Sequence, residues 1–176
     1  RLDELFTDRT RLVCIGGASN LLGTINDVAS VCERARRAGA LTFIDGVQSV
    51  PHIATDVQAI GCDFLACSAY KFYGPHVGVL YCRPGLQDQV DTDRLRTQSQ
   101  KAPGRIETGT QNHAANIGTA AAIEYLASWG DGDGLRARIE SAMTRIGAHE
   151  RAVAAYCWER LGAIPGVDLY GPDFSN

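Results

Sequence analysis

The sequence has 176 residues, of which 45% are hydrophobic, and a formal net charge of -3. This is enough apolar material for one substantial domain, and the small net charge favours small-molecule chemistry over a nucleic-acid or membrane partner. The apolar runs are shorter than the roughly 20 residues needed to cross a bilayer, and the first residues lack the order of a signal peptide. We therefore expect a soluble, cytoplasmic protein.

Short β-branched and apolar runs alternate with helical patterns in the first half of the chain. This alternation predicts strands at residues 11–15, 41–44, 64–67 and 77–82, and helices at residues 27–38 and 57–60. Strands separated by helices are typical of a largely parallel sheet, whereas the last two strands are too close for a crossover helix and are expected to be antiparallel. The sequence therefore predicts an α/β fold.

The second half of the chain contains a polar stretch and two long helical patterns. Residues 87–105 predict a loop, and helices are expected at residues 114–128 and 135–161. We expect residues 1–130 to form a domain built on the sheet, and residues 131–176 to form a linking helix and the start of a small C-terminal domain. Because the sequence lacks an initiating Met and stops soon after a predicted turn, we expect a piece of a longer protein that is inactive alone.

The six cysteines form no CxxC pair, and the four histidines are isolated from one another and from any cysteine pair. Most of the cysteines lie in apolar runs, so we expect them to be small core residues rather than disulfide partners. Metal ligands need closer spacing, and no metal site is expected.

Polar residues follow three of the predicted strands. Asn20 follows the first strand, Asp45 and Gln48 end the second, and Ser68 and Lys71 end the third. Because the carboxyl ends of parallel strands share one edge of a sheet, these side chains are expected to converge on one cleft. Pyridoxal phosphate (PLP) needs such a set: a lysine for the Schiff base, an acid beside the pyridine nitrogen, and donors for the phosphate and the ring oxygen.

Each of these residues also has an ordinary structural explanation. Asp45 could cap the turn toward Gln48, Lys71 could be a solvated charge, and Ser68 could be a loop hydroxyl. Their joint occurrence at consecutive strand ends favours the cofactor interpretation. In that interpretation Lys71 carries PLP, Asp45 keeps the pyridine nitrogen protonated, Gln48 donates to the ring oxygen and Ser68 binds the phosphate.

Five blocks of sequence resemble the class V aminotransferase family, most closely its cysteine desulfurase and selenocysteine lyase branch. The blocks are SNLLGT at residues 19–24, FIDGVQSVPH at 43–52, CDFL at 62–65, SAYKFYGP at 68–75 and ETGTQN at 107–112. They occur in order and at family spacing, and the resemblance covers most of residues 10–120. It is weak beyond residue 130.

The resemblance implies a fold type I PLP enzyme with a three-layer large domain, an amino-acid substrate and a homodimer with active sites at the subunit interface. It assigns Lys71 to the Schiff base and Asp45 to the pyridine nitrogen. It assigns Gln48 and Asn20 to the ring hydroxyl and the substrate, and Ser68 to the phosphate. The family therefore supports the same roles as the strand-end argument.

Two further positions come from the resemblance. Thr110 matches the threonine that reaches the phosphate of the neighbouring subunit, although Thr or Asn here could instead cap the following helix. Tyr70 stands where many desulfurases have a histidine that helps to bind phosphate, and its phenol can still donate a hydrogen bond. The persulfide cysteine of the desulfurases lies on a later loop, and none of the six cysteines occupies its context.

Sulfur removal from cysteine is the leading hypothesis for the reaction. Transamination, epimerisation or another β-elimination remain open, because these reactions share the same ring chemistry. A non-catalytic α/β interaction module is the alternative of another class. It has no chemical need for Lys71 and Asp45, which argues against it.

Overall fold

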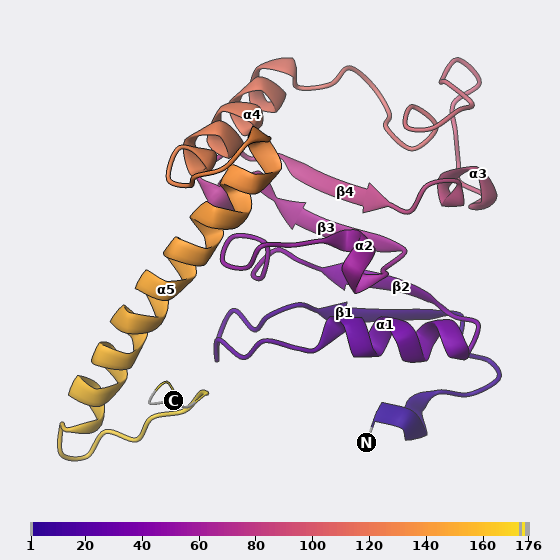
Figure 1. Ribbon diagram of the computed structural model, residues 1–176. Coiled ribbons are helices and arrows are strands. Elements are labelled where there is room, and N and C mark those ends of the chain that lie inside the picture. Colours follow the sequence, from indigo (N-terminus) through magenta and orange to yellow (C-terminus); the bar gives the residue numbers. More distant parts are fainter. Residues whose placement is uncertain (1, 173, 175–176) are drawn as a thin grey trace.

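The computed structural model describes residues 2–172 and 174 and contains, within them, a sheet of four strands in the order β1-β2-β3-β4 (Figure 1). The strands are β1 (Leu12–Gly16), β2 (Leu41–Asp45), β3 (Phe64–Ser68) and β4 (Gly78–Cys82). The pairs β1-β2 and β2-β3 are parallel, and β3-β4 is antiparallel. The predicted α/β fold, its mostly parallel sheet and its antiparallel last pair are confirmed.

The helices also lie close to their predicted positions. They are α1 (Val28–Arg37), α2 (Val57–Ile60), α3 (Leu86–Gln89), α4 (His113–Ala127) and α5 (Gly134–Gly162), with 3-10 turns η1 (Leu2–Leu5) and η2 (Ala69–Phe72). The predicted loop at residues 87–105 is wrong only at its start, where buried Leu86 anchors the single turn of α3. Across the described chain, no helix has both the length and the apolar character needed to span a membrane.

Helices α1 and α2 lie on the same face of the sheet (Figure 1), and each begins at an aspartate. The Asp27 carboxylate accepts a hydrogen bond from the Ser30 N–H, and Asp56 accepts from two N–H groups at the start of α2. These backbone hydrogen bonds lower the pKa of Asp56. Gly39 and Gly61 follow the helices with φ of 73° and 70°. A residue with a Cβ is strained in this left-handed conformation, whereas glycine is not. Local capping therefore sets both ends of each helix.

Two groups of buried residues hold these elements together. The first joins α1 to the sheet and consists of Cys32, Ile44, Cys62 and Leu65. The second joins η2 to α4 and consists of Ala69, Phe72, Ala122 and Leu126. The segment that carries Lys71 is therefore anchored in a core of its own.

The six cysteines are free thiols, of which two are buried, two are partly buried and two are exposed. Cys32 and Cys62 are buried as expected, and burial raises the pKa of Cys62 to about 11. The prediction of core positions is wrong for Cys14 and Cys157, which are exposed. Cys14 lies in β1, one of the two edge strands of the described sheet, and Cys157 lies in the distal part of α5, which projects beyond the sheet in Figure 1.

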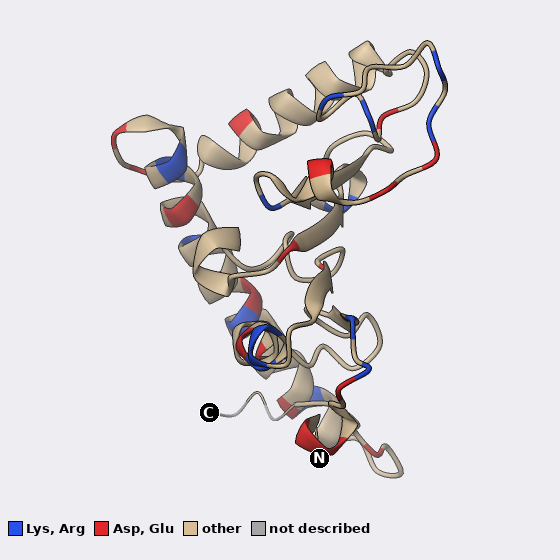
Figure 2. Ribbon diagram, turned by 90° about the vertical axis from the view of Figure 1, so that its right-hand side faces the viewer, with Lys and Arg blue, Asp and Glu red and all other residues tan. Residues whose placement is uncertain are grey.

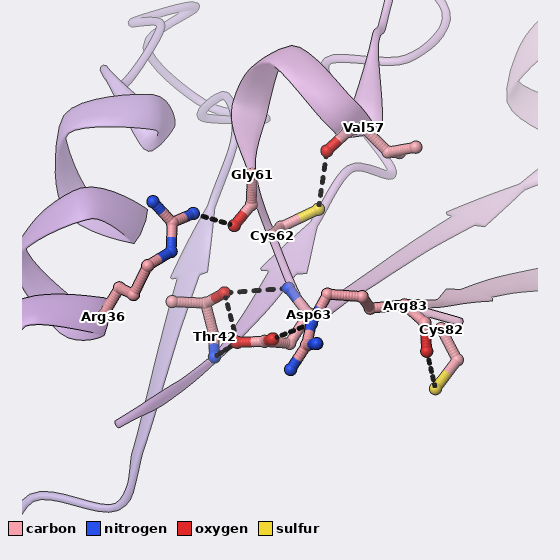
Figure 3. Close-up of polar contacts among 8 residues, drawn as sticks. All are labelled: Arg36, Thr42, Val57, Gly61, Cys62, Asp63, Cys82 and Arg83. Carbon is pink, nitrogen blue, oxygen red and sulfur yellow. Dashed lines mark hydrogen bonds and ion pairs between the residues drawn. The ribbon is translucent and has the colours of Figure 1, made fainter. Parts of the chain in front are cut away.

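A polar network ties the amino ends of β2 and β3 together (Figure 3). The Asp63 carboxylate accepts hydrogen bonds from Thr42 N at 2.8 Å and from Arg83 Nε at 2.7 Å, and Asp63 N donates to Thr42 Oγ1 at 3.0 Å. Thr42 is only 1% exposed, so these bonds satisfy polar groups that water does not reach. This network supports the sheet at the edge where β2 and β3 begin.

Helix α5 has 29 residues and is about 43 Å long at 1.5 Å per residue. In Figure 1 it runs past the ends of the strands, and His52 Nδ1 lies 3.0 Å from Glu150 Oε1. Figure 2 shows charged residues of both signs along α5 and along the connection between α3 and α4. The loop that follows β2 is therefore in contact with a helix almost a hundred residues further along the chain.

Candidate functional site

The carboxyl ends of β1, β2 and β3 lie side by side, in register. Gly17 N donates a hydrogen bond to Asp45 O at 2.8 Å, and Gly46 N donates to Ala66 O at 2.8 Å. Asp45 is thus held between the end of β1 and the end of β3, and Ser68 is the last residue of β3. The structure brings the polar strand ends named from the sequence to one edge of the sheet.

The Asp45 side chain is exposed at this edge and has a local partner. Its Oδ1 accepts a hydrogen bond from Val47 N at 3.0 Å, which is the turn-capping role considered for it above. A Cβ on the intervening Gly46 would lie 3.1 Å from Ala66 O and 3.0 Å from Val50 Cγ2. The close approach of the backbone after β2 therefore requires glycine at the position that follows Asp45.

Gln48 and Asn20 lie on the loops that follow β2 and β1. Gln48 is half-buried in a turn closed by a hydrogen bond from Val50 N to Gly46 O at 2.9 Å. Asn20 is exposed in a short loop that is closed by a hydrogen bond from Ser19 N to Thr24 O at 2.9 Å. Both amides are thus on the same edge as Asp45, on loops whose backbones are hydrogen-bonded.

Lys71 lies in η2, directly after β3, in a loop whose two ends are joined by backbone hydrogen bonds. Ala69 N donates to Val77 O at 2.8 Å, and Gly74 N donates to Ala69 O at 2.9 Å. Ala69 is fully buried and Phe72 is 8% exposed, whereas Lys71 is only partly buried. The neighbours of Lys71 are fixed in the core, and its side chain is left accessible at the sheet edge.

Helix α4 packs against this loop through the second group of buried residues. Phe72 packs with Ala122 and Leu126 of α4, and a Cβ added to Gly118 would lie 3.3 Å from Pro75 Cγ. The small residue at position 118 lets the helix approach the loop closely. The position of Lys71 thus depends on α4, which begins more than forty residues later in the chain.

The aromatic ring of Tyr70 is next to Lys71 and contacts a second residue. Lys71 Nζ lies 5.2 Å from the centroid of the Tyr70 ring. The His76 ring stacks on Tyr70, with centroids 4.7 Å apart and an angle of 19° between the planes. No role was predicted for His76 from the sequence, because the histidines were considered only as metal ligands. The position of His76 five residues after Lys71, in the same short loop, is the signal that could have indicated its contact with Tyr70.

Thr110 is exposed in the segment before α4. The cap of α4 is Asn112, whose side chain accepts a hydrogen bond from Ala115 N at 3.1 Å. Of the two residue types considered for the cap, the asparagine has this role, so the Thr110 hydroxyl is not needed to begin the helix. The structure does not bring Thr110 into contact with Lys71 or Asp45 among the interactions of the described residues.

The residues at this edge fit the requirements of PLP. Lys71 offers an amine, Asp45 a carboxylate, and Ser68 and Tyr70 offer hydroxyl groups, while Asn20 and Gln48 offer amides. An amine for covalent attachment, an anion for a pyridinium nitrogen and neutral donors for oxygens are the set that this cofactor needs. In an open α/β sheet, ligands bind outside the carboxyl ends of the strands, where these residues lie.

A cavity of about 600 Å³ lies at the other end of the sheet, near Cys32, Arg36, Asp63 and Arg83. Its charged groups already have structural partners: Arg36 Nη2 donates to Gly61 O at 2.9 Å, and Arg83 pairs with Asp63 (Figure 3). We therefore place the candidate site at the carboxyl edge rather than in this cavity.

Gly74→Ala is expected to destabilise the loop that positions Lys71. An added Cβ would lie 3.0 Å from both Ala69 Cβ and Ala69 O, and Ala69 has no space in which to move because it is fully buried. Overpacking of this kind costs about 1–3 kcal/mol. Chemical denaturation should show this loss. The control is Gly78→Ala in β4, where a Cβ meets nothing within 4 Å; equal stability of the two variants would contradict the prediction.

The chain is an α/β domain with an aspartate at the end of β2 and a lysine in the turn directly after β3. The family model described as Aminotransferase class-V matches residues 1–176. The chain belongs to the class V aminotransferase family, which confirms the resemblance seen in the sequence.

Several relatives and solved structures that are similar to this chain are cysteine desulfurases. The chain is 39% identical to cysteine desulfurases of Salmonella typhimurium and Salmonella typhi, over 97% of its length and 42% of theirs. It resembles the crystal structure of the cysteine desulfurase CsdA from Escherichia coli, with a TM-score of 0.78 and 32% identity over 94% of this chain and 41% of that one. The apo structure of the cysteine desulfurase from Thermococcus onnurineus NA1 has a TM-score of 0.76 and 30% identity, over 92% of this chain and 40% of that one. The chain thus spans about two fifths of these proteins.

Proposed function

We propose that the protein containing this chain is a PLP-dependent enzyme that removes sulfur from cysteine. The observation that carries the proposal is Lys71, held by a closed loop at the carboxyl end of β3, at the same edge as the exposed Asp45 carboxylate. The cysteine desulfurases among the relatives support the choice of reaction. Bound PLP would supply a ring that withdraws electrons from the substrate's α-carbon.

Each residue of the site has a role in this proposal. Lys71 Nζ would hold the cofactor covalently, and its amine would move a proton to and from the substrate's α-carbon. Asp45 keeps the pyridine nitrogen protonated, because a nearby carboxylate favours the charged form of its partner. The remaining residues bind and orient: Gln48 and Asn20 at the ring hydroxyl and the substrate, Ser68 and Tyr70 at the phosphate, and Thr110 at the phosphate of a neighbouring subunit.

The proposal extends to the organisation of the whole protein. Residues 1–130 would belong to the cofactor-binding domain, and residues 131–176 would form the linking helix and the start of a small C-terminal domain. The projection of α5 beyond the sheet supports this division (Figure 1). The assignment of Thr110 to a neighbouring subunit requires a homodimer, and we place that dimer in the cytoplasm.

Reduction with borohydride tests the attachment of PLP. The complete protein should purify yellow, and borohydride should bleach the colour and fix the cofactor to Lys71. Peptide mapping has an internal control, because Lys71 and Lys101 are the two lysines of this sequence and Lys101 is exposed in the connection before α4. An adduct on Lys101, or on a lysine outside this sequence, would refute the assignment. Sulfide release from cysteine then tests the reaction itself.

A further inference from the structure

His76 and Lys71 both contact the ring of Tyr70. The imidazole stacks on the phenol ring at a centroid distance of 4.7 Å, and Lys71 Nζ lies 5.2 Å from the centroid of the same ring. One aromatic side chain therefore connects the histidine to the amine.

The backbone of the loop produces this arrangement. Ala69 N donates to Val77 O at 2.8 Å, which closes the loop at those two positions. Tyr70 and His76 are the next residues inward on the two sides of that closure, so their side chains face each other. Val77 N also donates to Pro75 O at 2.8 Å, which restricts the turn that carries His76.

The ring of Tyr70 receives less support from the core than its neighbours do. Tyr70 is 44% exposed, whereas Ala69 is fully buried and Phe72 is 8% exposed. A ring that is nearly half exposed is not oriented by core packing alone. Its orientation therefore depends on contacts such as the stack with His76.

We propose that His76 is a positioning residue for Lys71, and that it acts through Tyr70. The flat imidazole holds the phenol ring by stacking, and the face of that ring attracts the lysine ammonium. The same stack fixes the direction in which the phenol hydroxyl points. This inference rests on the proposed function, in which Lys71 carries PLP and Tyr70 contacts its phosphate.

The test compares two substitutions at His76 in the complete protein. His76→Ala removes the ring, whereas His76→Phe keeps a flat ring that can stack. The dissociation constant of PLP is measured by titrating the cofactor-free protein and following the visible absorbance. We expect His76→Ala to raise this constant by about three- to tenfold, the effect of losing one aromatic pair, and His76→Phe to stay within about twofold of the parent.

A double-mutant cycle separates action through Tyr70 from a general structural effect. In a Tyr70→Ala background, His76→Ala should change the PLP dissociation constant by less than about twofold, because the ring on which it acts is gone. Additive effects of the two substitutions would overturn the proposal. So would equal weakening by His76→Ala and His76→Phe, or a parental dissociation constant in His76→Ala.

Thermal unfolding of every variant shows whether the substitution has disturbed the fold. His76 is exposed, so its substitutions should leave the midpoint close to that of the parent. Borohydride mapping of the parent distinguishes failure of the His76 proposal from failure of the proposed function. If PLP is fixed to Lys71 and the His76 variants bind it normally, only the role of His76 is refuted. If PLP is not fixed to Lys71, the proposed function fails.

Discussion

Lys71→Arg is expected to lower turnover at least about a thousandfold while leaving the fold intact. Arginine keeps the positive charge that faces the Tyr70 ring, but its guanidinium is always protonated, so it can neither attach PLP covalently nor exchange protons with the substrate. General acid–base catalysis alone contributes roughly 10²- to 10⁴-fold, and the variant loses attachment as well. Turnover of cysteine and the thermal unfolding midpoint are the two measurements.

The structure explains why folding should survive this change. The loop is held by buried Ala69 and Phe72 and by its backbone hydrogen bonds, whereas the Lys71 side chain is only partly buried. Lys101→Arg is the matched control, because it makes the same chemical change at an exposed position in the connection before α4. If Lys71→Arg kept the parental rate, another residue would have to carry the cofactor.

Asp45→Asn is expected to lower kcat/KM by about 10- to 150-fold, which corresponds to the loss of a charge-assisted hydrogen bond of roughly 1.5–3 kcal/mol. The substitution removes the charge that would keep the pyridine nitrogen protonated. It preserves the shape of the turn, because the asparagine side-chain oxygen can still accept the hydrogen bond from Val47 N. Activity should therefore fall much more than stability.

The matched control for this variant is Asp27→Asn. Asp27 is also a carboxylate that accepts a backbone hydrogen bond, from Ser30 N at 3.0 Å, and Asn is as good a helix cap as Asp. We expect its kcat/KM and its unfolding midpoint to match those of the parent. A parental rate in Asp45→Asn would show that Asp45 is only a turn cap, and an equal loss in both variants would indicate a general effect of charge removal.

Local chemistry explains why most elements could be predicted. Asp27 and Gly39 define the ends of α1, and Asp56 and Gly61 define those of α2, through hydrogen bonds and backbone angles within a few residues. The direction of each strand followed from whether a helix lay between it and the next. The turn of α3 was missed because it depends on burial of Leu86, which is decided by the packing around it.

The candidate site was predictable where it depends on strand ends. Asp45 and Ser68 end β2 and β3, and Lys71 follows directly, so a parallel sheet places them together whatever covers its faces. The roles of Asn20 and Thr110 could be inferred only from the family. Asn20 lies at the tip of a loop and Thr110 precedes α4, and strand order says nothing about where either points.

Periodicity, capping and the shared edge of parallel strands were enough to predict the fold class, the strand ends and the position of Lys71 after the third strand. The contacts between side chains on different segments depend on tertiary packing. Closure of the loop by Ala69 and Val77 brings His76 onto Tyr70, and the path of α5 brings Glu150 within 3.0 Å of His52. The contact of His52 with Glu150 depends on the packing of whole elements, because 98 residues of sequence separate the two side chains and no local pattern encodes that separation.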